Sequence, residues 1–201
     1  MPQIVLASGN RGKLRELQAL LPEWVAVRTA GELGVVLPEE TGTTFAENAL
    51  LKARAAAEQT GLIAVADDSG LVVEALAGAP GVRSARFAGE PADDAANNAL
   101  LRRRLEGVPA HERRAEFHST VAVVTPEGEE WLAEGTLAGR ITHAPRGSQG
   151  FGYDPLFVPE GLDRTLAELT LEEKNAISHR ARAFQAAARR LVPLLQAGRT
   201  E

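Results

Sequence analysis

The chain has 201 residues, of which 44% are hydrophobic and 24% charged, values typical of a soluble globular protein with a sizeable core. A formal net charge of −5 argues against nucleic acid as a partner, although a small anionic ligand needs only local positive charge. The absence of cysteine excludes disulfides, zinc–thiolate sites and thiol catalysis. The sequence has no signal-peptide core and no apolar run near the length of a membrane span, so we expect no membrane partner and a cytoplasmic protein.

Apolar periodicity and turn residues predict that strands and helices alternate along the chain. In chain order we expect a strand at 4–7, a turn at 8–12, a helix around 14–21, a helix at 44–60, a strand at 63–66 that ends at the turn 67–70, an extended segment at 71–73, a helix at 91–106, strands at 117–125 and 131–141, and a helix after 178. Thr44 and Glu47 form a capping-box pattern at the start of the second helix.

The order of these elements predicts the fold class. Two long adjacent strands imply antiparallel pairing beside the strand–helix units, which indicates an α/β protein with a long mixed central sheet flanked by helices. No internal repeat or linker divides the chain. We therefore expect a single domain over 1–201, built either as one compact unit or as two closely apposed lobes.

Lysine is rare in this sequence. Of 22 basic side chains only Lys13, Lys52 and Lys174 are lysine, and each lies in a stretch dense with Gly, Asn, Asp or Glu. Lysine presents a compact point charge that fits beside phosphate oxygens, whereas arginine is a wide planar fork. The three lysines therefore suggest a polyanion site assembled from distant parts of the chain, with chance and surface exposure as the alternative.

The segment SGNRGK at 8–13 follows the first predicted strand. Backbone N–H groups of a glycine-bearing turn at a helix N-terminus can bind an anion, and Lys13 adds a full charge. The spacing is not that of a P-loop, because Ala7 occupies the first glycine position and Leu14 the hydroxyl position. Phosphate binding and an ordinary strand–helix turn both remain open from this pattern alone.

Acidic residues suggest a metal site. Asp67 and Asp68 follow an apolar strand, and such carboxylates commonly hold a hard divalent cation beside a phosphate. Adjacent extended residues point in opposite directions, so one carboxylate should face the ligand while the other braces the turn. Glu39 and Glu40 could complete the site or form a solvated loop.

On the capped helix, Asn48 and Lys52 are four residues apart and share a face. Their neighbours are apolar, so this polar face is expected to border a cleft. An exposed helical stripe is the alternative.

The segment GFGYDP at 150–155 combines glycines with two aromatic side chains. Glycine allows close approach of a flat ligand, an aromatic face can stack on a base, and Asp154 can accept hydrogen bonds from it. A turn with two core aromatics is the alternative. Lys174, His179 and Arg180 follow, and their position does not decide a role for His179.

Together these segments resemble the inosine triphosphate pyrophosphatase family, whose members remove non-standard purine nucleoside triphosphates. The resemblance extends in order over LASGNRGKLREL (6–17), EETGTTFAENALLKARAAA (39–57), ADDSGLVVEALAGAPGVRSARFAG (66–89), GFGYDPLF (150–157) and AELTLEEKNAISHRARA (167–183). It implies a two-lobed α/β fold with a central nucleotide cleft, a homodimer, and Mg²⁺-dependent hydrolysis of the bond between the α- and β-phosphates. The products are the nucleoside monophosphate and pyrophosphate.

The resemblance also implies roles for individual residues. Glu40 and Asp68 bind Mg²⁺, Asp68 activates water, and Lys52 offsets charge at the scissile phosphoryl group. The triphosphate is held by Ser8, Gly9, Asn10, Arg11, Gly12 and Lys13. The remaining substrate contacts come from Asn48, Ser69, Phe151, Gly152, Tyr153, Asp154, Lys174, His179 and Arg180.

Two other functions are considered. Nucleotide pyrophosphatases of the Maf type share the general architecture and reaction but prefer other bases, and they are not expected to carry FGYDP and ISHR in this form. A nucleotide-binding regulator without turnover is the alternative outside enzymes, and the intact Asp68, Glu40 and Lys52 argue against it.

Selectivity for a 6-oxo purine is expected to come from hydrogen bonding. A donor aimed at O6 of the base would reject the amino group of adenine, while the sequence does not show what rejects guanine.

Overall fold

The computed structural model describes residues 1–198, so the expected domain 1–201 extends three residues beyond the described part. The strands are β1 (Gln3–Leu6), β2 (Ala26–Thr29), β3 (Ile63–Val73), β4 (Arg114–Val124), β5 (Glu130–Ile141) and β6 (Phe157–Pro159). The α-helices are α1 (Arg11–Leu20), α2 (Phe45–Thr60), α3 (Asp94–Arg104), α4 (Leu171–Ile177) and α5 (His179–Ala197). No helix among the described residues is long and apolar enough to cross a membrane.

The six strands form one mixed sheet in the order β2-β1-β3-β4-β5-β6. Strand β1 runs parallel to both β2 and β3, with Ile4 opposite Val27 on one side and Ile63 on the other. Strands β5 and β6 are antiparallel, with Ile141 opposite Phe157. The predicted α/β class with a mixed sheet is therefore confirmed.

The chain divides into two compact units. The first contains residues 1–68, 119–135 and the chain from 180 onward, and the second contains residues 69–118 and 136–179.

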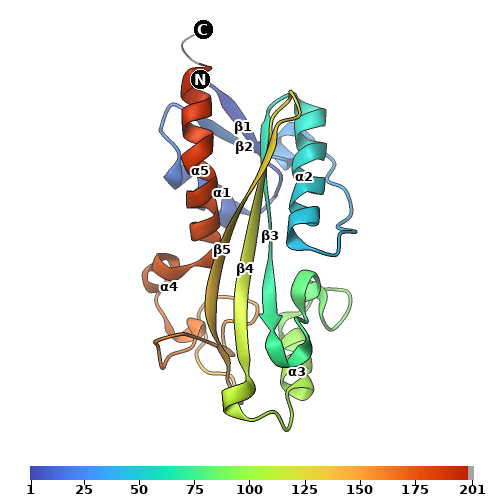
Figure 1. Cartoon of the computed structure of the whole chain (residues 1–201), viewed down its shortest axis with the longest axis vertical. Coiled ribbons are helices and arrows are strands. Elements are labelled where there is room, and N and C mark those ends of the chain that lie inside the picture. The colour runs from blue at the N-terminus through green and yellow to red at the C-terminus, as the bar shows by residue number, and fades with distance from the viewer. Residues whose placement is uncertain (199–201) are drawn as a thin grey trace. The chain divides into compact units, whose positions relative to one another are not determined.

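The first unit has an apolar layer on each face of its strands. Helices α1 and α5 cover one face, where Leu17 and Phe184 pack with Val65 of β3. Helix α2 covers the other face, where its alanines, Ala53 among them, pack with Ala66 of the same strand (Figure 1). Side chains alternate between faces along a strand, so residues 65 and 67 share one face and 66 and 68 share the other.

The second unit has a core of its own. Leu71 and Val73 from β3 pack with Leu101 of α3 and with Phe117 and Phe157. The rings of Phe117 and Phe157 have centroids 4.6 Å apart, at a tilt of 55°.

The start of α2 agrees closely with the sequence, whereas α1 begins earlier than expected. Thr44 caps α2, and both hydrogen bonds of the predicted capping box with Glu47 are present. Asn10 caps α1, so this helix begins within the segment expected to be a turn. The sequence did not predict strand β2, strand β6 or helix α4, which have four, three and seven residues.

The strand predicted to end at Ala66 instead continues to Val73, which corrects the turn expected at 67–70. Asp67 and Asp68 therefore lie within β3 rather than beyond it. The polar run resembles a turn in sequence, but each carboxylate is satisfied where it stands by side chains from the helices on its own face.

Candidate active site

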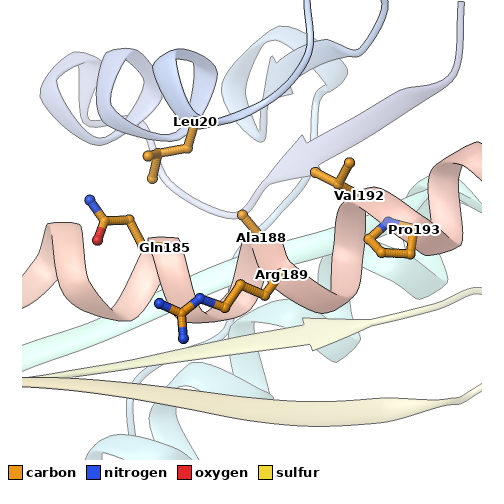
Figure 2. A pocket seen from close by; sticks show the side chains of 6 residues that line it. All are labelled: Leu20, Gln185, Ala188, Arg189, Val192 and Pro193. Atoms are coloured by element: carbon orange, nitrogen blue, oxygen red, sulfur yellow. The ribbon is translucent and has the colours of Figure 1, made fainter.

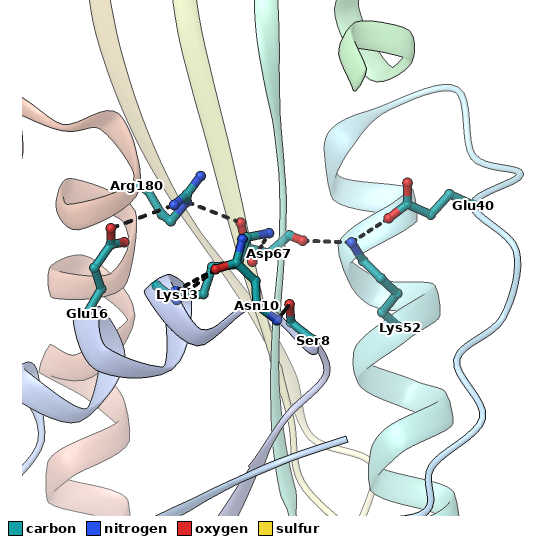
Figure 3. A network of polar contacts seen from close by, with 9 residues as sticks. Ser8, Asn10, Lys13, Glu16, Glu40, Lys52, Asp67 and Arg180 are labelled. Carbon is teal, nitrogen blue, oxygen red and sulfur yellow. Dashed lines mark hydrogen bonds and ion pairs between the residues drawn. The ribbon is translucent and has the colours of Figure 1, made fainter. Parts of the chain in front are cut away.

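The loop after β1 is organised by Asn10. Its side-chain oxygen accepts hydrogen bonds from the backbone N–H groups of Gly12 (2.8 Å) and Lys13 (3.3 Å). The hydroxyl of Ser8 accepts the N–H of Asn10 at 3.1 Å. Two of the amides expected to bind an anion are thus engaged by the capping side chain, whereas the Lys13 ammonium extends toward β3 (Figure 3).

Asp67 lies between two cations from different helices. Its carboxylate is 2.8 Å from Nζ of Lys13 and 3.8 Å from Nε of Arg180, which also pairs with Glu16 at 3.6 Å (Figure 3). Burial alone would raise the pKa of Asp67, but the charges of Lys13 and Arg180 outweigh it, so the pKa is lowered. Asp67 is therefore an ionised carboxylate in an ion-pair network, not the brace of a turn.

Lys52 connects the acidic loop to β3. Its ammonium donates to Oε1 of Glu40 at 2.5 Å and to the backbone carbonyl of Asp67 at 2.7 Å (Figure 3). Lys52 is only 9% exposed and Asn48 only 1%, so the alternative of an exposed stripe on α2 does not hold. Of the acidic pair at 39–40, Glu39 is exposed and Glu40 is half-buried.

Asp68 faces α2, on the opposite side of β3 from Asp67. Its Oδ2 accepts a hydrogen bond from Nδ2 of Asn48 at 3.1 Å, and Oδ1 of Asn48 accepts the N–H of Gly42 at 2.7 Å. Burial raises the pKa of Asp68, and the negative charges of Glu40 and Asp67 raise it further, against the opposing effect of Lys52 and Asn48. Asp68 is thus a proton acceptor that is stronger than an ordinary aspartate.

Carboxylates of this kind suit a divalent cation that is shared with substrate. Among residues 1–198 there is no group of three or more His, Cys, Asp or Glu that could hold a metal ion. Mg²⁺ commonly uses only one or two protein carboxylates and completes its shell with water and phosphate oxygens. Glu40 and Asp68, whose repulsion raises the pKa of Asp68, fit that requirement.

The second unit contains the loop 150–154. Phe151 is 62% exposed, and Nζ of Lys174 lies 4.5 Å from the centroid of its ring. The same ammonium donates to Oδ2 of Asp154 at 2.5 Å. A Cβ on Gly150 would lie 2.0 Å from that carboxylate, so no side chain fits there.

The aromatic pair of this loop has two different environments. Tyr153 is buried in the core, and its hydroxyl donates to the carbonyl of Ser84 at 2.7 Å. Asp154 is also buried, which leaves the Phe151 ring as the aromatic surface that a base could contact. The ring of His179 stacks on Phe117 with centroids 5.0 Å apart, and Ser69 is a half-buried residue of β3.

The structure gathers the predicted residues into two clusters, one in each unit. The first cluster contains Ser8, Gly9, Asn10, Arg11, Gly12, Lys13, Glu40, Asn48, Lys52, Asp68 and Arg180, while the second unit holds Ser69, Phe151, Gly152, Tyr153, Asp154, Lys174 and His179. The sequence did not reveal that Asp67 pairs with Lys13 and Arg180, nor that Asp94 and Asn98 of α3 hydrogen-bond to Gly152. Their spacing marks Asp94 and Asn98 as one helix face, but only the fold shows what that face contacts.

A pocket beside α5 is separate from these residues. It is lined by Leu20, Gln185, Ala188, Arg189, Val192 and Pro193 (Figure 2). None of these is a predicted site residue, and the lining offers no carboxylate or nucleophile.

Comparisons with known proteins agree with one another. The model of the Ham1 family matches residues 4–190. The dITP/XTP pyrophosphatase of Pseudomonas aeruginosa is 54% identical over 194 residues, covering 95% of this chain and 98% of its own. The counterpart from Elusimicrobium minutum is 51% identical over 189 residues, covering 91% and 96%.

Solved structures give the same result. A HAM1 protein from Coxiella burnetii superposes with a TM-score of 0.90 at 45% identity, covering 95% of this chain and 98% of its own. A nucleoside-triphosphatase / dITP/XTP pyrophosphatase from Mycobacterium abscessus superposes with a TM-score of 0.79 at 50% identity, covering 92% and 98%.

Proposed function

The chain belongs to the Ham1 family, and we propose that it hydrolyses non-standard purine nucleoside triphosphates, namely dITP, XTP and ITP, to the nucleoside monophosphate and pyrophosphate. Relatives named dITP/XTP pyrophosphatase, at 51% and 54% identity over nearly the whole chain, support this activity. The observation that carries it is Asp68, a largely buried carboxylate of raised pKa beside Asn48, Lys52 and Glu40.

The first unit provides the groups for phosphate chemistry. Asp68 accepts the proton of the attacking water, and Asn48 fixes the carboxylate for that step. Lys13 and Lys52 bring positive charge to the phosphates as the bond between the α- and β-phosphates breaks.

We propose that Glu40 and Asp68 hold Mg²⁺ there, which neutralises phosphate charge and lowers the pKa of bound water. The charge of the cluster supports this. Among its ion-paired side chains and Asp68, Lys13, Lys52 and Arg180 supply three positive charges, while Glu16, Glu40, Asp67 and Asp68 supply four negative ones, for a net of −1 when all are ionised and the exposed Arg11 is left out. A triphosphate adds about four more negative charges, so productive binding calls for a divalent cation.

The second unit provides the surface for the base. The exposed ring of Phe151 stacks on the purine, with Lys174 over the same ring. Stacking does not discriminate between purines, so selection depends on hydrogen bonds to the edge of the base.

The direct test is pyrophosphate release from ITP, XTP, dITP, GTP, ATP and dTTP, each with Mg²⁺ and with EDTA. We expect Mg²⁺-dependent release that is greatest with dITP, XTP and ITP. A preference for dTTP would favour a Maf-type activity, and tight binding of ITP without pyrophosphate release would favour a regulator.

We further propose that the protein is a cytoplasmic homodimer, as the family resemblance implies. Light scattering coupled to size exclusion tests the assembly, with an expected mass of twice the chain's 21.4 kDa. A mass of one chain at micromolar concentration contradicts it.

A further inference from the structure

The exposed ring of Phe151 is attached to a fully hydrogen-bonded stretch of backbone. Its own N–H donates to Oδ2 of Asp154 at 3.0 Å, and its carbonyl accepts the N–H of Asp154 at 3.2 Å. The N–H of Gly152 donates to Oδ2 of Asp94 at 2.7 Å, and the carbonyl of Gly152 accepts from Nδ2 of Asn98 at 2.8 Å. A surface loop that satisfies all four of these polar groups with protein partners is held in one conformation.

Half of these bonds come from outside the loop. Asp94 is the first residue of α3 and Asn98 lies one turn later, so the two side chains share a helix face and hold the peptide groups on both sides of Gly152. Nδ2 of Asn98 also donates to the carbonyl of Asp94 at 2.9 Å, which links the two residues. Gly152 has φ +58°, a conformation that other residues rarely adopt, so the loop turns sharply at the point where α3 holds it.

Exposure alone assigns the ring no role, because single apolar side chains are often exposed and Leu171 is more exposed still, at 74%. The informative feature of Phe151 is that both its backbone and its ring are restrained. Lys174 lies over the ring and bonds to Asp154, so the ring and its backbone are restrained by the same group of residues.

We propose that Asp94 and Asn98 are positioning residues for nucleotide binding: they hold Gly152 so that the Phe151 ring is fixed in its stacking position before substrate arrives. This inference rests on the proposed function, because it assigns the ring to the base. Restraining the ring in advance removes the entropic cost of ordering it on binding, so the effect belongs in KM rather than kcat.

The test is a double-mutant cycle with dITP. We expect Asp94→Ala to raise KM about three- to tenfold with kcat changed less than twofold, as follows from freeing one side chain that binding must order again. In the Phe151→Ala background the same change should alter KM less than twofold, because the ring through which it acts is gone. Asp94→Asn retains an acceptor oxygen and should restore most of the wild-type KM.

Asp93→Ala is the matched control. Asp93 caps the same helix by accepting the N–H of Ala96 at 2.8 Å, and it has no bond to the loop. It should lower Tm without raising KM. An equal rise in KM from Asp93→Ala, or an Asp94→Ala effect of the same size with and without Phe151, overturns the proposal. Asn98→Ala provides the same cycle if Asp94→Ala does not fold.

A readout without substrate separates this inference from the proposed function. Relaxation of the Phe151 ring carbons by NMR should show greater ring mobility in Asp94→Ala than in the wild type and in Asp93→Ala. If the wild type releases no pyrophosphate from any purine triphosphate, the proposed function fails, whereas unchanged ring mobility in Asp94→Ala overturns the positioning role.

Discussion

Asp67 and Asp68 are neighbours in β3, yet their carboxylates have opposite electrostatic surroundings. Asp67 meets Lys13 and Arg180 on the face of α1 and α5, and its pKa is lowered. Asp68 is buried on the face of α2, and this burial, together with the charges of Glu40 and Asp67, raises its pKa against the opposing effect of Lys52 and Asn48. The two-residue alternation of a strand thus separates an ion-pairing carboxylate from a basic one.

We expect Asp68→Asn to lower kcat about a thousandfold, since we propose that this carboxylate both binds the metal and accepts the water's proton. Tm should not fall, because a raised folded-state pKa means that the ionised carboxylate is unfavourable in the fold. Steady-state kinetics and thermal unfolding measure the two effects, with the exposed Asp163→Asn as control. A kcat within tenfold of wild type would falsify the assignment.

Asp67→Asn should act mainly on stability. It leaves two cations without their buried partner, at a cost of about 3 kcal/mol in the free energy of unfolding. The pKa of Asp67 is lower in the folded state than in the unfolded state. The stability that its carboxylate contributes is therefore fully present above the unfolded-state pKa of about 3.9, and it is lost as pH falls through the folded-state pKa. Urea unfolding of the metal-free protein should therefore show a wild-type advantage at pH 7 that shrinks in acid, and a pH-independent difference contradicts this.

Lys13→Arg and Lys52→Arg should each reduce kcat/KM at least about tenfold while the protein remains folded. The Lys52 ammonium sits between Glu40 and the carbonyl of Asp67, in a space where a planar guanidinium adds bulk. Arg189→Lys is the converse control. Arg189 lines the pocket beside α5 rather than the candidate site, so this change should leave kcat/KM unaltered (Figure 2). Wild-type kcat/KM in both Lys→Arg variants would show that the point charge of lysine is not required.

At the scale of single elements, the sequence predicted those helices whose position depends on residues close together in the chain. The Thr44–Glu47 capping box fixed the start of α2, apolar periodicity located α1, and the helices expected at 91–106 and after 178 correspond to α3 and α5. The end of β3 was predicted wrongly because Asp-Asp-Ser-Gly is turn-like in isolation, whereas Lys13 and Asn48 satisfy the carboxylates in the fold. Such partners are distant in sequence, and no local pattern encodes them.

The loop before α2 depends on a close approach at Gly42. A Cβ there would lie 2.6 Å from Oδ1 of Asn48 and 2.7 Å from Cβ of Glu47. Gly42→Ala should push the Asn48 amide away from Asp68 and reduce kcat/KM about tenfold or more, as misplacement of a catalytic group does. Gly31→Ala is the matched control, since nothing lies within 4 Å of a Cβ at Gly31. Kinetic constants equal to wild type in Gly42→Ala would exclude the Gly42–Asn48 contact from catalysis.

At the scale of the whole molecule, the resemblance supplied what patterns could not. Composition and periodicity indicated only an α/β protein suited to a small anion. The long ordered motifs pointed to one family, and the match of the Ham1 model over residues 4–190 agrees with them. The same motifs include Phe151 and Asp154 but not Asp94 and Asn98. The role proposed for those two residues of α3 depends on their hydrogen bonds to Gly152, which only the fold shows.

In the proposed function the Phe151 ring stacks on any purine, so we expect the base preference to depend on hydrogen bonding. A donor aimed at O6 leaves the adenine amino group facing another donor, a mismatch that costs on the order of 3 kcal/mol, or about a hundredfold in rate. We therefore expect kcat/KM for ITP, dITP and XTP at least about a hundredfold above that for ATP, with ribose and deoxyribose forms differing little.

Variants of the base-contacting residues test the source of this preference. Phe151→Ala should lower kcat/KM for every purine substrate alike. His179→Ala or Arg180→Ala should reduce the ratio of kcat/KM between ITP and ATP if those side chains contact the base edge. Because Arg180 also pairs with Asp67, its variant needs a parallel Tm measurement to separate lost selectivity from lost stability. Comparable hydrolysis of ATP and ITP by the wild type would rule out a role in clearing non-standard purines from the nucleotide pool.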